Sequence, residues 1–153
     1  MKISIIRVAK GKVAWADQAV QEYLKRITQG WKLDELVLKL SPKGDILQRQ
    51  QQETAHIVQQ LKEGDYLIVL DERGEQISSE VFAGWLKDAM DNSVKRVVFA
   101  IGGPFGHEPI LRTKADKVLG FSPMVLNHEL VRVLLAEQLY RASTIIWGGN
   151  YHH

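Results

Sequence analysis

Residues 96–106, with the sequence Arg-Val-Val-Phe-Ala-Ile-Gly-Gly-Pro-Phe-Gly, constrain the fold of this chain more than any other stretch. Residues 97–101 are uninterruptedly apolar and rich in β-branched and aromatic types, which is typical of a strand buried on both faces of a sheet. Three glycines and a proline follow within five residues, which favours a loop whose backbone faces a ligand over a simple chain reversal. Ligands bind at the carboxyl ends of strands in open parallel sheets. We therefore expect a parallel sheet with a ligand-binding loop after residue 101.

Strand and helix patterns alternate along the remaining sequence. Apolar runs predict strands at residues 2–9, 33–40, 65–70 and 118–121. Apolar residues at helical spacing predict helices at residues 15–27, 45–61, 81–90 and 129–146, with Trp15 and Leu47 in the apolar stripes of the first two. The polar segment at residues 107–117 is also expected to be helical. Gly30 is expected to close the first helix, and Asp45 and Ser78 (or Ser79) are expected to be N-caps. A polar loop at residues 71–74 and a flexible tail at residues 148–153 complete the expectation. The pattern predicts one α/β domain over residues 1–153, with a mostly parallel sheet flanked by helices.

Composition narrows the classes of protein. A hydrophobic content of 45% with 25% charged residues is ordinary for a globular protein. The net charge of +2 permits local nucleic-acid contact without requiring it. No apolar run reaches membrane-spanning length, so we expect a cytoplasmic protein without a membrane partner. Basic clusters that could contact nucleic acid are Arg7, Lys10 and Lys12; Lys25 and Arg26; and Arg112, Lys114 and Lys117.

Several kinds of site are disfavoured. The chain has no cysteine, which excludes disulfides, thiolate metal ligands and a thiol nucleophile. The glycine loop has neither the spacing of a dinucleotide fingerprint nor the Lys-Ser/Thr of a P-loop. Histidines 56, 107, 128, 152 and 153 show no metal-ligand spacing, so no metal is expected and His56 is interpreted as a surface residue.

The last predicted helix is apolar around much of its circumference. Its apolar residues are Leu130, Val131, Val133, Leu134, Leu135, Leu139, Ile145 and Ile146. A helix with so little polar surface needs cover on both sides, which favours a subunit interface.

Four segments together carry a family resemblance. They are Leu70-Asp71-Glu72-Arg73-Gly74 with Ser78-Ser79-Glu80, the loop at residues 101–106, the segment at residues 121–142, and the closing Tyr151-His152. The helix signature Arg-Val-x-x-x-Glu-Gln-x-Tyr-Arg-Ala, from Arg132 to Ala142, is the most specific part. The chain resembles the RlmH family over essentially its whole length. These are SPOUT-class methyltransferases that act on N3 of a pseudouridine in 23S, large-subunit ribosomal RNA.

The resemblance implies a SPOUT-type α/β trefoil knot, a homodimer, and S-adenosylmethionine bound in the knot. Because the net charge is small, isolated RNA should bind weakly and with marked salt dependence, so we expect the substrate to be an assembled ribosomal particle that adds shape contacts. The residues that match the family's cofactor-binding elements are Leu70, Gly102, Gly103, Phe121, Ser122, Pro123, Met124, Val125 and Leu126. Glycine backbone and apolar walls suit a largely uncharged adenosine, which agrees with the reading of the loop from its residues.

The catalytic candidates implied by the resemblance are His128, Arg132, Glu137, Arg141, Tyr151 and His152. The general base stays open among His128, His152 and Glu137, while the two arginines are candidates for stabilising negative charge. The resemblance places Tyr151 and His152 near the partner subunit's site. Structural roles compete with each of these assignments: Glu137 with Arg141 and Glu129 with Arg132 are spaced as intrahelical ion pairs, and His128 is placed to flank the helix start.

Three positions depart from the family pattern. Asn127 stands where relatives usually have proline, Glu75 where lysine is common, and His153 where a basic residue is frequent. One alternative is a ribosome- or RNA-binding protein that keeps the fold without the chemistry, and another is a small-molecule α/β enzyme using a different nucleotide. Binding of S-adenosylmethionine discriminates among the three.

Overall fold

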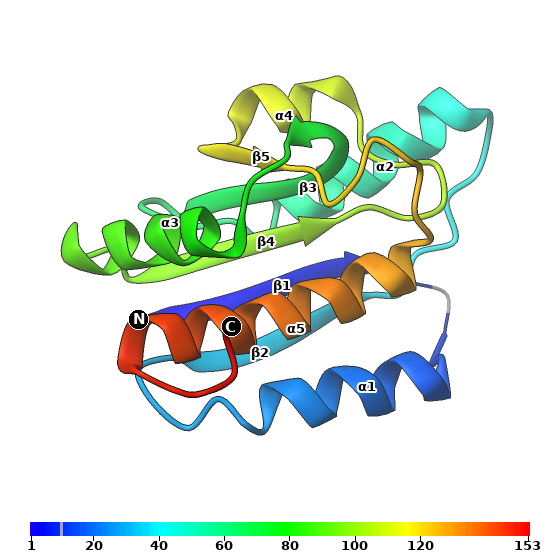
Figure 1. Ribbon diagram of the computed structural model, residues 1–153. Coiled ribbons are helices and arrows are strands. Elements are labelled where there is room, and N and C mark those ends of the chain that lie inside the picture. Colours follow the sequence, from blue (N-terminus) through cyan, green and yellow to red (C-terminus); the bar gives the residue numbers. More distant parts are fainter. Residues whose placement is uncertain (10) are drawn as a thin grey trace.

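The computed structural model describes residues 1–9 and 11–153. Within that part of the chain, a parallel sheet has the strand order β2-β1-β4-β3-β5 (Figure 1). The strands are β1 (Lys2–Val8), β2 (Lys32–Leu38), β3 (Tyr66–Glu75), β4 (Arg96–Ile101) and β5 (Lys117–Leu119). The helices are α1 (Ala14–Leu24), α2 (Ile46–Val58), α3 (Ser79–Asp91), α4 (Pro109–Lys114) and α5 (His128–Trp147). The predicted α/β class with a parallel sheet flanked by helices is confirmed.

The helices lie in two layers, one on each face of the sheet (Figure 1). The connections β1–β2 and β3–β4 step across the sheet in one direction, whereas β2–β3 and β4–β5 step in the other. Because such crossovers are right-handed, the two sets of connecting helices must lie on opposite faces. Accordingly α1 and α3 cover one face, and α2 and α4 cover the other. Helix α5 returns to the first face and packs against both α1 and α3.

Strand β4 is the centre of the core, as its sequence predicts. Residues 97–101 are each 3% exposed or less, and successive side chains point into different apolar clusters. Val97, Phe99 and Ile101 face the layer of α1, α3 and α5, while Val98 and Ala100 face α2 and α4. Burial on both faces explains why β4 is apolar without alternation.

Helix α5 receives cover from its own chain on two sides. Leu135 and Leu139 are fully buried between α1 and α3. Leu130 and Leu134 instead remain 45% and 40% exposed on the outer surface. Much of the apolar circumference is thus satisfied within this chain, and an apolar ridge remains outside. No helix of the described residues has the combination of length and apolarity that spanning a membrane demands.

Two predicted elements have different bounds in the structure. Residues 71–74 are not a polar loop but belong to β3, whose end wraps around β5: the Gly120 N–H donates to the carbonyl of Glu75 at 3.0 Å. The helix expected at residues 107–117 is only α4, since Pro109 starts it and extended Ala115 ends it. Asp116 then exchanges hydrogen bonds with the backbone of Leu67, which begins the β5 edge.

Of the predicted helix ends, two N-caps are confirmed and one C-terminal end is wrong. Asp45 caps α2 through a capping box with Gln48, and the Ser78 hydroxyl accepts from the Val81 N–H at the start of α3, as predicted. Gly30 does not close α1, which ends at Leu24. Gly30 instead packs against the Trp147 ring, one atom of which lies 1.9 Å from where a Cβ on Gly30 would be. Two residues assigned to the apolar stripes, Trp15 and Leu47, are exposed.

Candidate functional site

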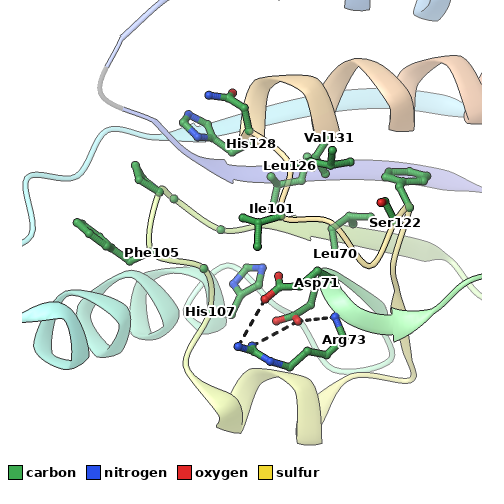
Figure 2. Close-up of a pocket in the computed structure, with 18 of the residues that line it drawn as sticks. Leu70, Asp71, Arg73, Ile101, Phe105, His107, Ser122, Leu126, His128 and Val131 are labelled. Carbon is green, nitrogen blue, oxygen red and sulfur yellow. Dashed lines mark hydrogen bonds and ion pairs between the residues drawn. The ribbon is translucent and has the colours of Figure 1, made fainter.

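A cavity of about 500 Å³ opens at the carboxyl ends of β3 and β4, beside the first turn of α5 (Figure 2). It is lined by three segments far apart in the sequence: residues 70–73 at the bend of β3, the glycine loop at residues 101–107, and the loop between β5 and α5. Gln50 from α2 and Val131 from α5 complete it. The volume lies in the range of small-molecule and cofactor sites.

Most of the predicted cofactor-binding residues line this cavity. They are Leu70, Gly102, Gly103, Phe121, Ser122, Met124, Val125 and Leu126, whereas Pro123 is not part of the lining. Leu70 and Ile101 are buried in the wall, while Met124 and Val125 are 72% and 83% exposed at the rim. The structure therefore brings together the three segments that the sequence separates.

The glycine loop is pressed against its surroundings, which explains two of its glycines. A Cβ on Gly102 would lie 3.0 Å from the Gly106 carbonyl carbon and 3.2 Å from Cε1 of His107. A Cβ on Gly103 would lie 2.7 Å from a carboxylate oxygen of Glu53. Side chains at these positions would displace the loop, so the wall here is backbone.

Two buried polar residues on the cavity wall were not among the predicted site residues. Asp71, 8% exposed, accepts hydrogen bonds from the Arg73 N–H at 3.0 Å and from Nη1 of Arg112 at 2.9 Å. His107 is 4% exposed, and its Nε2 has no hydrogen-bond partner among the described residues. Burial lowers the pKa of His107 to about 4, although the nearby charge of Asp71 opposes this, so the ring is neutral at pH 7. The sequence could have indicated both residues. Asp71 lies in the segment Leu70-Asp71-Glu72-Arg73-Gly74 that carries the family resemblance, and His107 directly follows the glycine loop.

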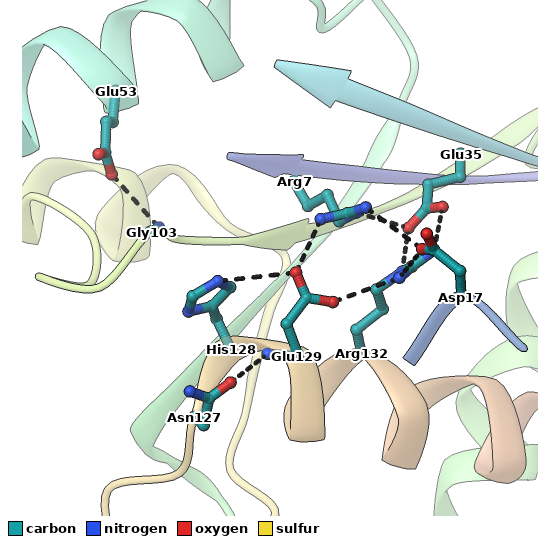
Figure 3. A network of polar contacts seen from close by, with 9 residues as sticks. All are labelled: Arg7, Asp17, Glu35, Glu53, Gly103, Asn127, His128, Glu129 and Arg132. Atoms are coloured by element: carbon teal, nitrogen blue, oxygen red, sulfur yellow. Dashed lines mark hydrogen bonds and ion pairs between the residues drawn. The ribbon is translucent and has the colours of Figure 1, made fainter. Parts of the chain in front are cut away.

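Arg132 lies in a buried ionic network rather than in the cavity wall (Figure 3). It donates to Glu35 Oε2 at 2.7 Å, to Asp17 at 2.6 Å and to Glu129 at 3.3 Å, which confirms the alternative ion pair with Glu129. Burial disfavours its charge, but the hydrogen bonds that it donates to Glu35 and Asp17 outweigh this and raise the pKa of Arg132 above its usual range. The hydrogen bonds and ion pairs of Arg132 with the described residues are all made to these carboxylates.

Arg7 belongs to the same network, which corrects one expectation. It was grouped with Lys10 and Lys12 as a basic cluster for RNA, yet Arg7 is 4% exposed. Its Nε donates to Glu35 at 2.9 Å and its Nη1 to Glu129 at 3.0 Å. Because these carboxylates surround it, Arg7 is withdrawn from any nucleic-acid surface. Lys10 lies outside the described residues.

The start of α5 places His128 at the cavity. The Asn127 side chain accepts from the Glu129 N–H at 2.8 Å and so caps the helix. His128 is the first helical residue, lines the cavity, and has Nε2 3.7 Å from Glu129 Oε1. His128 thus flanks the start of α5, as the alternative structural role predicted, and it also lines the cavity (Figure 2).

The C-terminal tail is held against its own chain, so the expected flexible tail was wrong. The Tyr151 ring lies 4.6 Å from the Tyr140 ring and 4.6 Å from the Arg141 guanidinium, and its hydroxyl donates to Glu137 at 3.3 Å. Arg141 also pairs with Glu137 at 2.6 Å, which confirms that predicted ion pair.

His152 is anchored to α3. Its Nε2 lies 2.8 Å from Oε1 of Glu80. Hydrogen bonds from the Ser78 hydroxyl, from the Glu80 backbone and from His152, in that order, lower the pKa of Glu80 to about 2. This carboxylate is consequently an anion that holds the tail.

The catalytic candidates therefore fall into two groups along α5, which has 20 residues and so spans about 30 Å. His128 lies at its cavity end. The tail leaves the other end of α5 and folds back, so that Tyr151 contacts Glu137, about 14 Å along the helix from His128, and His152 contacts Glu80 in the first turn of α3 (Figure 1). Glu137 and Arg141, midway and beyond, do not line the cavity either. Among the described residues, no cluster of three or more His, Cys, Asp or Glu is arranged to hold a metal ion.

Comparison with known proteins identifies the family. The model of a family described as "Predicted SPOUT methyltransferase" matches residues 1–152. The ribosomal RNA large subunit methyltransferase H of Trichlorobacter lovleyi is 37% identical over 153 residues, covering 100% of both chains. The protein of that name from Oleidesulfovibrio alaskensis is 38% identical, covering 99% of this chain and 98% of its own.

A solved structure shares the fold at low sequence identity. The crystal structure of a probable methyltransferase from Bordetella pertussis Tohama I superposes with a TM-score of 0.56, covering 92% of this chain and 95% of that chain at 12% identity. With a family match over nearly every residue and relatives more than a third identical along their full lengths, this chain belongs to the SPOUT methyltransferase family.

Proposed function

We propose that this protein transfers a methyl group from S-adenosylmethionine to N3 of a pseudouridine in large-subunit ribosomal RNA, with the assembled ribosomal particle as its substrate. The observation that carries the proposal is the cavity whose walls are Leu70, the glycine loop and residues 121–126. Full-length relatives named ribosomal RNA large subunit methyltransferase H support the choice of substrate.

The residues present fit the methyl donor. The volume of about 500 Å³ accommodates an adenosine with an amino-acid arm. Apolar walls from Leu70, Ile101 and Leu126 suit the adenine, and the side-chain-free backbone of Gly102 and Gly103 offers N–H and C=O groups at close range. When bound, the donor supplies a methyl group on a sulfonium centre with a neutral thioether as leaving group, so the protein's task is to align the acceptor nitrogen.

The expected trefoil knot is supported by a tight crossing beside the cavity. A Cβ on Gly74 would lie 2.6–2.7 Å from backbone atoms of Val118, Leu119 and Gly120. The end of β3 thus curls around the β5 segment that leads into the lining loop at residues 121–126. This contact of backbone on backbone is what threading of one segment past the other requires.

A homodimer with shared sites is supported by the position of the tail in its own chain. The tail folds back from the end of α5 to Glu137, about 14 Å along the helix from His128, and neither Tyr151 nor His152 lines its own cavity. The exposed ridge of Leu130 and Leu134 gives α5 an apolar surface for a second copy. In the proposed dimer, the tail and Arg141 of one copy complete the cavity of the other.

Methylation at N3 requires removal of the N3 proton. His128 lines the cavity of its own chain, and the second copy would bring His152; the base is one of these two. Glu137 is already engaged by Arg141 and Tyr151, so its role is to position that pair. The Arg141 guanidinium is suited to stabilise the anionic ring left by deprotonation.

The experiment is incubation of ribosomes that lack the modification with this protein and S-adenosylmethionine, followed by mass spectrometry of the ribosomal RNA. One added methyl on a pseudouridine of the large-subunit RNA is expected. The isolated RNA stem-loop is expected to be a poor and strongly salt-dependent substrate, since the net charge is only +2. Calorimetry with S-adenosylmethionine separates the non-catalytic alternative, for which no binding heat is expected.

The shared site is tested by mixing two damaged variants. His128→Ala and a chain ending at residue 150 are each expected to be inactive. Random exchange between them produces dimers with one intact site, so a 1:1 mixture is expected to recover about a quarter of wild-type activity. A mixture no more active than its components would contradict the shared site.

A further inference from the structure

One face of helix α2 holds the glycine loop by its backbone. The Gly103 N–H donates to Glu53 Oε2 at 3.3 Å, and the Glu108 N–H donates to Thr54 Oγ1 at 3.2 Å. Between them, the Gln50 side-chain amide donates to the carbonyl of Phe105 at 2.6 Å. Side chains from about one turn of helix therefore bind three peptide groups of one loop, and Figure 3 shows Glu53 pointing at Gly103.

Glu53 and Thr54 are buried, although neither lines the cavity. Each is 3% exposed, and with Ile57 they form the buried part of α2. A carboxylate and a hydroxyl on the buried side of a helix lower stability unless they are hydrogen-bonded, and an apolar residue would pack there at less cost. Among the described residues, each accepts a hydrogen bond from a peptide group of the loop, so the sequence of α2 is matched to the loop.

The fit between Glu53 and the loop is also steric. The carboxylate oxygens lie 2.7 and 2.8 Å from where a Cβ on Gly103 would be. A side chain at residue 103 would therefore push the buried carboxylate away and break its bond with the Gly103 N–H. Glu53 and Gly103 occupy one shared space.

From these contacts we infer that Glu53 and Thr54 are positioning residues, which fix residues 103–108 in the conformation that receives the methyl donor and so set donor affinity without touching the donor. The inference rests on the proposed function, because it takes the cavity to be the donor site. Gln50 is left out of the claim, since it lines the cavity and could contact the donor directly.

The test uses Glu53→Ala, Thr54→Val and Glu53→Gln in the full chain, with Gln51→Ala on the exposed side of α2 as the matched control. Calorimetry with S-adenosylmethionine measures affinity, and hydrogen exchange measures protection of the amides of Gly103 and of residues 105–108. Loss of one acceptor from a buried N–H is expected to weaken donor binding about tenfold and to speed exchange in the loop. In turnover, KM for the donor rises while kcat changes little. Glu53→Gln retains an acceptor oxygen and is expected to restore most of the affinity.

A double-mutant cycle covers the case in which a single variant folds poorly. Gly103→Ala alone is expected to weaken donor binding, and combination with Glu53→Ala removes the atoms that the new Cβ strikes. The combined loss is therefore expected to be at least about fivefold smaller than the product of the single losses. Multiplicative effects, or unchanged loop exchange and affinity in folded Glu53→Ala and Thr54→Val, would overturn the inference.

Failure of the proposed function gives a different result. In that case the wild-type protein shows no binding of S-adenosylmethionine, while the loop amides still exchange faster in Glu53→Ala than in wild type. The conclusion that α2 positions the loop would then hold, whereas the identification of the ligand as S-adenosylmethionine would fail.

Discussion

Nη1 of Arg7 lies 3.0 Å from Oε1 of Glu129, which joins the first strand to the first turn of the last helix across 122 residues of sequence. The other oxygen of Glu129 accepts from Arg132 at 3.3 Å, so one carboxylate bridges two guanidinium groups. The three residues are 3–4% exposed. This network fixes the start of α5, and with it the position of His128 at the cavity (Figure 3).

Replacement of Arg7 by methionine is expected to lower the free energy of unfolding by about 3 kcal/mol, because Glu129 and Glu35 would lose a partner inside the protein. Urea denaturation measures the change. Lys87→Met is the control, since its pair with Asp91 is exposed and is worth about 0.5 kcal/mol. A loss for Arg7→Met no larger than that of the control would show that the network contributes little to stability.

His107 is expected to make the fold acid-sensitive between pH 6.5 and about 4. Its pKa is lowered from 6.5 to about 4 by burial, so in this window the unfolded chain binds a proton that the folded chain does not. The contribution of His107 to the free energy of unfolding therefore has its full value above pH 6.5. It decreases as the pH falls, by about 2 kcal/mol at pH 5.

Urea denaturation at pH 7.5 and pH 5 measures this effect. His107→Leu is expected to show a pH dependence smaller by that amount, because leucine takes up no proton in either state. His56→Leu serves as the control, as His56 is exposed on α2. An identical pH dependence for wild type and His107→Leu would refute the assignment.

Gly74→Ala is expected to lower the free energy of unfolding by about 3 kcal/mol, since its Cβ would meet backbone atoms at 2.6–2.7 Å, at the upper end of the cost of overpacking. The displaced β5 segment leads into the cavity loop, so donor binding is expected to weaken as well. Gly84→Ala in α3 is the matched control: no atom lies within 4 Å of its Cβ, and alanine should stabilise the helix by about 0.5–1 kcal/mol. Equal effects of the two substitutions would mean that the crossing is not tight in solution.

A chain ending at residue 150 is expected to lose turnover about a hundredfold or more, as removal of proton-transferring groups does, while donor affinity stays unchanged. The tail contacts α3 and α5 and not its own cavity, so donor uptake should not depend on it. Methylation assays and calorimetry on the same preparation separate the two quantities. Removal of His153 alone is the control. Normal turnover by the shortened chain would exclude Tyr151 and His152 from catalysis.

Local patterns predicted the parts of the fold that depend on neighbours in sequence. The apolar run of β4 and the caps Asp45 and Ser78 are such cases, because burial on both faces and capping leave marks within a few residues. The prediction for residues 71–74 was wrong because they form the irregular stretch of β3 between Leu70 and Glu75. Both of these residues pair with Leu119 of β5, more than 40 residues away, and a polar sequence gives no sign of such pairing.

The candidate site was predictable to a similar limit. The composition of the glycine loop predicts a ligand-binding site, whereas the segments at residues 70 and 121–126 were found only through family resemblance. Arg7 looked like a surface cation because its carboxylate partners come from α1, β2 and α5, which no spacing rule connects. The tail looked flexible because its partners Glu80 and Glu137 lie on two other stretches of chain.

The exclusion of the tail from the cavity of its own chain has a genetic consequence under the proposed function. A copy that lacks its last residues still carries an intact cavity, but it leaves the cavity of its partner copy incomplete. Co-expressed with intact copies, such a truncated allele should act dominantly, and its harm should grow with its share of the cellular pool.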